Sequence, residues 1–229
     1  ASSNSATSTF PQLWANSFQA GDYIESPYFM ATSTTATSTF SGAVGIGTTS
    51  PLAKLTVVDG GILASGTLGD TPISGAGTRL MWIPAKGAFR AGQVTGTSWN
   101  DANIGLYSFA FGYDTIAGDY SFAGGRESSV TGIYSVGLGI GISASGISDV
   151  AIGQNITITN DYGIGLGSYG TVSGRYGILI GSKTGSEPSS SILEASGIGS
   201  IIIGTVEDYA STAATGDYSV VIGRNLQAT

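Results

Sequence analysis

Residues 216–223 read "GDYSVVIG", and residues 118–125 read "GDYSFAGG". The same motif, with a glycine near each end and apolar residues before the second one, starts eight times in the C-terminal half of the chain. Its first residues are Gly105, Gly118, Gly132, Gly146, Asn160, Gly174, Gly197 and Gly216, spaced 13, 14, 14, 14, 14, 23 and 19 residues apart. A fixed period of this kind is typical of a solenoid, in which each repeat forms one coil.

Fourteen residues per repeat suit two short strands joined by two tight turns. We number the positions of a repeat from its first residue, so that the second motif glycine stands at position 8. Tight turns need residues that tolerate positive φ, and we expect the glycines at positions 1 and 8 to supply them, with Asn160 as the one substitute. The position 8 glycines are Gly112, Gly125, Gly139, Gly153, Gly167, Gly181, Gly204 and Gly223.

The first strand of each repeat carries large apolar residues at positions 5 and 7, and position 6 between them is also apolar or glycine. Because side chains alternate across a strand, both faces of this strand are expected to be buried, with position 6 facing a neighbouring copy of the chain. Position 6 changes from Ala110 to Ile202 along the chain, so we expect the space between copies to widen toward the C-terminus. In the second strand, as in "QNITIT" at 154–159, apolar and polar residues alternate, so we expect one face of it to be exposed to solvent.

The composition excludes much enzyme chemistry. The chain has 229 residues with no His and no Cys, which rules out Ser-His-Asp and Cys-His nucleophiles, imidazole or thiolate zinc sites and disulfides. We therefore expect a protein that is not an enzyme and has no cofactor. A net charge of −7, with eight basic residues, makes nucleic acid or a membrane surface unexpected as partners. The chain begins at Ala1 without a signal peptide, and we expect a mature form or a fragment.

The stretches "SDVAIG" at 148–153 and "YSVVIG" at 218–223 resemble the head repeat of the YadA-like trimeric autotransporter adhesins. The resemblance covers residues 105–229 and implies a left-handed parallel β-roll of 14-residue coils that assembles as a homotrimer. It also implies an extracellular or cell-surface protein that attaches to a surface, host cell or matrix through a glycan or protein receptor.

The N-terminal half is expected to be a β-rich, intertwined fibrous region made of two segments. In residues 41–104, "VGIGTTSPLAKLTV" at 44–57 resembles an element of phage tail fibres and bacterial surface proteins, with one strand at V-G-I-G and another at Lys54–Val58. Residues 1–40 form an extended Ser/Thr-rich segment whose aromatic residues are expected to pack at a trimer interface. These aromatic residues are Trp14, Phe18, Tyr23, Tyr28 and Phe29.

Two insertions, 182–196 and 205–215, are the candidate binding loops, because a solenoid carries its variable chemistry in loops. Their candidate residues are Lys183, Glu187, Glu194, Glu207, Asp208 and Tyr209. Paired carboxylates there would suit a glycan-cleaving tail spike. That function, a receptor-binding phage tail fibre on a virion tail and a self-assembling extracellular filament subunit are the alternatives to an adhesin.

Two further sets of residues recur at the first turn. Asp119, Asp161 and Asp217 occupy position 2, where a solvated edge is favoured over a calcium ladder. Tyrosines occupy position 3 in six repeats and should form a partial ladder, with corner packing favoured over carbohydrate stacking. They are Tyr107, Tyr120, Tyr134, Tyr162, Tyr176 and Tyr218.

Overall fold

The structure, a computed structural model, describes residues 39–183, 193–207 and 211–229. In these residues the chain is all-β apart from two short 3-10 helices, as the sequence predicts. It divides into two units between Ile62 and Leu63. The aromatic cluster expected within residues 1–40 lies outside the described residues.

The first unit contains β1 (Val44–Ile46) and β2 (Leu55–Val57), close to the two strands expected there. They pair in parallel, with Val44 opposite Leu55 and Ile46 opposite Val57. More than half of the surface of Ile46 and of Leu55 is exposed. A two-stranded sheet is marginal on its own, so this element leaves apolar surface without a partner in the described part of the chain.

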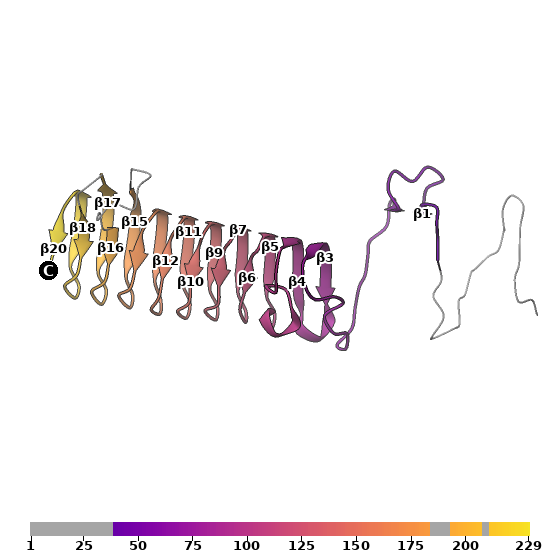
Figure 1. Cartoon of the computed structure of the whole chain (residues 1–229), viewed down its shortest axis with the longest axis horizontal. Helices are drawn as coiled ribbons and strands as arrows, with labels where there is room; N and C mark the ends of the chain where they lie inside the picture. Colours follow the sequence, from indigo (N-terminus) through magenta and orange to yellow (C-terminus); the bar gives the residue numbers. More distant parts are fainter. Residues whose placement is uncertain (1–38, 184–192, 208–210) are drawn as a thin grey trace, which may run out of the picture. The chain divides into compact units, whose positions relative to one another are not determined.

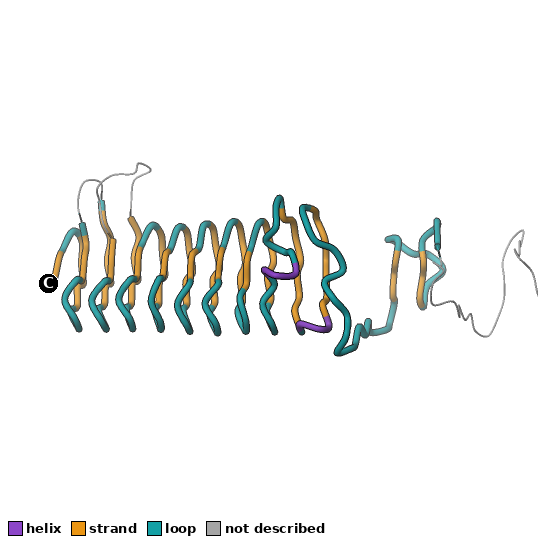
Figure 2. Tube along the Cα trace, turned by 60° about the horizontal axis from the view of Figure 1, so that its bottom comes forward, coloured by secondary structure: helices purple, strands orange, loops and turns teal. Residues whose placement is uncertain are grey.

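The second unit consists of two long sheets between which the chain alternates, giving a solenoid-like architecture (Figures 1 and 2). The ten-stranded sheet holds β3 (Gly77–Ile83), β4 (Ala88–Val94), β5 (Phe109–Tyr113), β7 (Phe122–Arg126), β9 (Val136–Ile140), β11 (Val150–Gln154), β13 (Ile164–Ser168), β15 (Ile178–Lys183), β17 (Ile201–Val206) and β19 (Val220–Arg224). The eight-stranded sheet holds β6 (Ile116–Ala117), β8 (Ser129–Val130), β10 (Ser143–Ala144), β12 (Thr157–Ile158), β14 (Thr171–Val172), β16 (Leu193–Ala195), β18 (Thr212–Ala214) and β20 (Gln227–Ala228).

From β4 onward every pairing is parallel and joins equivalent residues of successive repeats, as when Val150 pairs with both Val136 and Ile164. Each repeat therefore contributes one strand to each sheet, and the apolar residues between the two sheets form one continuous core. This arrangement is compatible with a β-solenoid.

Position 6 faces this core, which corrects the expectation that it faces a neighbouring copy. Ala110 and Ile202, which differ widely in size, are both fully buried within the chain. The change in size at position 6 is balanced inside the coils. Where position 6 is Gly137, a Cβ would lie 2.3 Å from Val130 Cγ2. Where position 6 is Ile202, position 13 of the same repeat is Ala214. In these two places a small residue at one position accompanies a large residue at the other, which helps to keep the core filled.

The glycines at position 1 are needed for close approach of the coils and not for positive φ, which also corrects the expectation. Gly132 has no positive φ, and a Cβ there would lie 1.7 Å from the carbonyl oxygen of Gly146 in the next coil. Positive φ occurs at most of the position 8 glycines, such as Gly167 (φ 131°), and also at positions 3 and 10, for example at Tyr162 (φ 63°) and Asn155 (φ 51°).

The core is closed at its N-terminal end by the antiparallel pair β3–β4 and by the helices η1 (Pro84–Lys86) and η2 (Asp101–Asn103). Trp99 is fully buried there and donates its Nε1–H to the Thr115 carbonyl at 2.8 Å. Arg90 is also fully buried, and its guanidinium donates to the Ser108 hydroxyl at 2.8 Å and the Ser108 carbonyl at 3.1 Å. Burial lowers the pKa of Arg90 to about 10, so it stays charged at neutral pH.

Candidate functional site

Three of the six candidate loop residues, Lys183, Glu194 and Glu207, lie within the described structure. Lys183 ends β15, and Glu194 lies within β16, where its Oε1 accepts a hydrogen bond from the Ser173 hydroxyl at 2.8 Å. Glu207 follows β17 and forms an ion pair with Arg224. Glu187, Asp208 and Tyr209 lie outside the described residues, so the pairing of carboxylates proposed for glycan cleavage stays a prediction.

The aspartates at position 2 hold neighbouring coils together. Asp119 Oδ1 accepts the backbone N–H of Leu106 at 2.8 Å, and Asp161 Oδ1 accepts that of Ile147 at 3.0 Å. Asp217 makes the same bond to the residue one coil earlier, Ile198, at 2.9 Å. Across residues 39–183, 193–207 and 211–229 no group of three or more metal-binding side chains comes together, and no helix has the length and apolar character to span a membrane.

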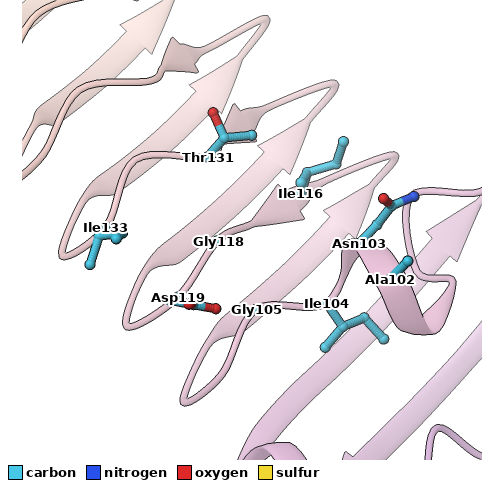
Figure 3. Close-up of a pocket in the computed structure, with 9 residues that line it drawn as sticks. All are labelled: Ala102, Asn103, Ile104, Gly105, Ile116, Gly118, Asp119, Thr131 and Ile133. Atoms are coloured by element: carbon cyan, nitrogen blue, oxygen red, sulfur yellow. The ribbon is translucent and has the colours of Figure 1, made fainter.

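A pocket of about 390 Å³ lies where η2 meets the first coils (Figure 3). Its two most polar lining side chains each make a hydrogen bond. Asp119 Oδ1 accepts the N–H of Leu106, and the Asn103 amide donates to the Thr97 carbonyl at 2.8 Å. Asp119 is the one ionisable residue of the lining, so the pocket offers no pair of acid and base groups. The pocket is lined by Ala102, Asn103, Ile104, Gly105, Ile116, Gly118, Asp119, Thr131 and Ile133.

The tyrosines at position 3 form the expected partial ladder. Ring centroids lie 5.1 Å apart for Tyr107 and Tyr120, 5.1 Å for Tyr120 and Tyr134, and 5.0 Å for Tyr162 and Tyr176. The rings are exposed, and the guanidinium of Arg175 lies 4.9 Å from the Tyr176 centroid. Corner packing alone would bury more of these rings.

All six ladder tyrosines have left-handed backbone, with φ between 52° and 63°. This conformation costs a bulky residue on the order of 1–3 kcal/mol. Each stacked aromatic pair stabilises the fold by about 0.5–1.5 kcal/mol, so stacking offsets the backbone strain in part. This backbone was not predictable from the sequence, because glycines at positions 1 and 8 were sufficient to account for the turns.

Positions 5 and 7 of the ten-stranded sheet form what we call the outer apolar face. Its side chains point away from the core, and Ile152, Ile180 and Ile203 are each about two fifths exposed. Near the N-terminal end the face is aromatic, with Phe109 stacked 4.9 Å from Phe89 and 5.2 Å from Phe122. Its further members are Phe111, Gly124, Val136, Leu138, Val150, Ile164, Leu166, Ile178, Ile201, Val220 and Ile222.

Position 4 carries a ladder of buried polar groups inside the coils. The Ser121 hydroxyl donates to the Gly132 carbonyl at 2.6 Å, and Ser135 repeats this bond to Gly146 at 3.0 Å. One coil further on, Asp149 replaces serine and is fully buried. Its Oδ1 accepts the backbone N–H of Gly163 at 3.0 Å, whereas Oδ2 has no hydrogen-bond partner in the described structure.

Burial raises the pKa of Asp149 above its ordinary value of 3.8, although backbone N–H groups of Gly163 and Gly146 oppose the shift. A carboxyl whose pKa is raised in the folded state stabilises the fold fully below its unfolded pKa and loses that contribution as pH rises. At neutral pH the ionised Asp149 therefore lowers the free energy of unfolding. When protonated, Oδ2 can donate a hydrogen bond as the serines at position 4 do.

We expect Asp149→Asn to stabilise the protein at pH 7 by about 1 kcal/mol or more, since a neutral amide removes a buried charge and adds a donor. Thermal unfolding at pH 7 should show a higher Tm by about 2–4 °C per kcal/mol. The gain should shrink as pH falls toward 3, where the wild-type carboxyl is protonated. A gain of the same size at pH 3 and pH 7 would contradict this assignment.

A scan against protein-family models found no match for the chain, and searches of curated proteins and of solved structures found none either. The functional conclusion therefore depends on the residues and the geometry described above.

Proposed function

We propose that this protein is a non-enzymatic, homotrimeric, extracellular fibre protein that attaches to a surface, host cell or matrix. The observation that carries the proposal is the outer apolar face. The eight strands that carry positions 5 and 7, at a spacing of about 4.8 Å, extend it over roughly 35 Å. Soluble monomers rarely leave a continuous apolar surface of this extent in water, so we infer that other copies of the same chain cover it.

Two further features support assembly with identical copies. The β1–β2 pair exposes apolar side chains that a monomer leaves uncovered. From β5 onward the ten-stranded sheet also has a regular outer face, since every coil presents positions 5 and 7. A uniform face suits a partner with the same repeat. The resemblance to YadA-like heads, whose 14-residue coils form left-handed β-rolls, favours three copies around one axis.

Sedimentation of the full chain tests this assembly. A homotrimer should sediment as one species of about 69 kDa, three times the chain mass of 23.0 kDa, and the species should persist on dilution. A stable species of 23.0 kDa would contradict the proposal, because the outer apolar face would then be tolerated in water.

The phage tail fibre, the glycan-cleaving tail spike and the extracellular filament subunit are the alternatives. The tail fibre and the tail spike would be trimers with the same covered face, so the oligomeric state does not separate them from an adhesin. Open-ended filaments would sediment as a broad, concentration-dependent distribution. A tail spike would cleave its receptor glycan, and the double substitution Glu207→Gln with Asp208→Asn would abolish that cleavage if these residues carry it.

A further inference from the structure

The tyrosine ladder is interrupted at two places that have the same surroundings. Ser148 and Gly199 occupy position 3, while the repeats on either side of each carry tyrosine there. Both keep the left-handed backbone of the ladder, with φ of 60° at Ser148 and 65° at Gly199. The rings that flank the two gaps are Tyr134 and Tyr162 for the first, and Tyr176 and Tyr218 for the second.

Each gap has the thickness of one ring. Coils stack about 4.8 Å apart, so rings two coils apart stand roughly 10 Å from each other. A ring inserted halfway would lie about 5 Å from each tyrosine, within the 4.5–7 Å range of ring contacts. Of the tyrosines that border the gaps, Tyr134 is 61% and Tyr218 78% exposed, against 48% for Tyr120, which has a ring on each side. Tyr162 and Tyr176, at 42% and 49%, are exposed about as much as Tyr120. The open ring faces are therefore clearest at Tyr134 and Tyr218.

Both gaps also have a carboxylate beside them. Asp161 and Asp217 stand at position 2 of the coil that follows each gap. In each of them Oδ1 accepts a backbone N–H from the preceding coil. The other carboxylate oxygen, Oδ2, has no hydrogen bond to any described residue, and it can accept one from a ligand.

We propose that the two gaps are slots that each bind one pyranose ring of a neutral surface glycan. The two tyrosine faces pack against the C–H faces of the sugar, and the aspartate accepts a hydrogen bond from a sugar hydroxyl. A mostly apolar slot with one placed polar group is typical of small-ligand sites. The net charge of −7 disfavours anionic glycans.

The two slots lie three coils apart, which is about 14 Å along the column. One oligosaccharide chain can therefore reach both, and the second contact then forms at a high effective concentration. This inference rests on the proposed adhesive function and names the class of receptor that the fibre binds. It assigns the attachment to the tyrosine corner and not to the two insertions.

Filling both slots tests the proposal directly. The double substitution Ser148→Tyr with Gly199→Tyr inserts the side chain that six other repeats carry, on a backbone that already has the φ of the ladder. A Cβ at Gly199 would lie 3.0 Å from Cδ1 of Tyr218, the movable ring of a neighbouring tyrosine. We therefore expect the variant to fold, with an unchanged or higher Tm.

Binding is measured by saturation-transfer NMR on the full chain, with chitotetraose and cellotetraose as neutral probes and a heparin tetrasaccharide as the anionic probe. The wild type should transfer saturation to at least one neutral probe and not to the heparin fragment. The double variant should bind at least tenfold more weakly. The matched control is Asn155→Tyr, which adds a tyrosine with left-handed backbone (φ 51°) at position 10 and should bind as the wild type does.

The slot proposal would be rejected if the wild type transferred saturation to neither neutral probe. It would also be rejected if the wild type and the double variant transferred saturation to a probe equally. Equal loss in Asn155→Tyr would reject it too, since binding would then not depend on the gaps. If the double variant sediments differently from the wild type and the control does not, the gaps would belong to a subunit interface and not to a glycan site. A wild type that is trimeric but binds no probe rejects the slots and leaves the fibre proposal standing, whereas a monomeric wild type rejects the fibre proposal itself.

Discussion

Replacing Gly167 by alanine should disrupt the stacking of the coils. A Cβ at this position would lie 1.6 Å from the carbonyl oxygen of Gly181 in the next coil, and φ is +131°, a region that side chains avoid. The backbone strain alone is on the order of 1–3 kcal/mol, and the clash with a backbone atom adds to it. We expect a loss of at least about 3 kcal/mol, and a fall in Tm of roughly 6–12 °C or more.

Thermal unfolding followed by circular dichroism measures the effect, and Gly96→Ala is its control. A Cβ added at Gly96 would have no atom within 4 Å, and the residue has no positive φ, so the same substitution there should leave Tm nearly unchanged. If Gly167→Ala were as stable as Gly96→Ala, the close contact of glycines at position 8 would not hold the coils in register.

Charges placed on the outer apolar face should separate the subunits of the proposed trimer. Ile152 and Ile180 lie two coils apart, side chain outward, and each is about two fifths exposed in the single chain. In a covered interface, Ile152→Asp with Ile180→Asp would bury charges without partners, at a cost of several kcal/mol in each of the three subunits. We expect the sedimenting species to fall from about 69 kDa to the single-chain mass of 23.0 kDa.

The core between the two sheets belongs to one chain, so the separated subunit should keep its β circular dichroism. The control is Ser129→Asp with Thr157→Asp, also two coils apart but on the solvent side of the eight-stranded sheet. Glu194 occupies the equivalent position in β16, which shows that this side accepts charge. A trimer that survives both pairs of substitutions would reject the outer apolar face as the interface.

The period of the sequence was sufficient to predict the all-β class, and the position 3 tyrosines were sufficient to predict a partial ladder. Which face of the first strand points into the core was not predictable. Positions 5, 6 and 7 are all apolar or glycine, and hydrophobicity alone does not distinguish a core-facing residue from an outward-facing one. The size complementarity of Gly137 and Val130 is the signal in the sequence that could have placed position 6 in the core. A glycine whose missing side chain would overlap a large residue of the adjacent coil must share the same core with it.

The buried polar groups were also missed by reasoning from sequence. Arg90 and Asp149 are charged residues, which are rarely buried, and neither has an oppositely charged residue close to it in the sequence. Asp149 nevertheless occupies position 4, where most repeats have serine, so its place in the repeat indicated an inward side chain. The two gaps in the tyrosine ladder were visible as Ser148 and Gly199, but their meaning required the exposure and spacing of the flanking rings.

The register of the two sheets has a mechanical consequence. In every pairing from β4 onward, the backbone hydrogen bonds point along the column, from one coil to the next. A pull applied between the two chain ends of the column therefore acts along these bonds and breaks them one after another, beginning with a terminal coil. Each freed 14-residue coil would then lengthen the chain by roughly 40 Å, so a tethered protein could absorb sudden tension in discrete steps while its remaining coils stay stacked.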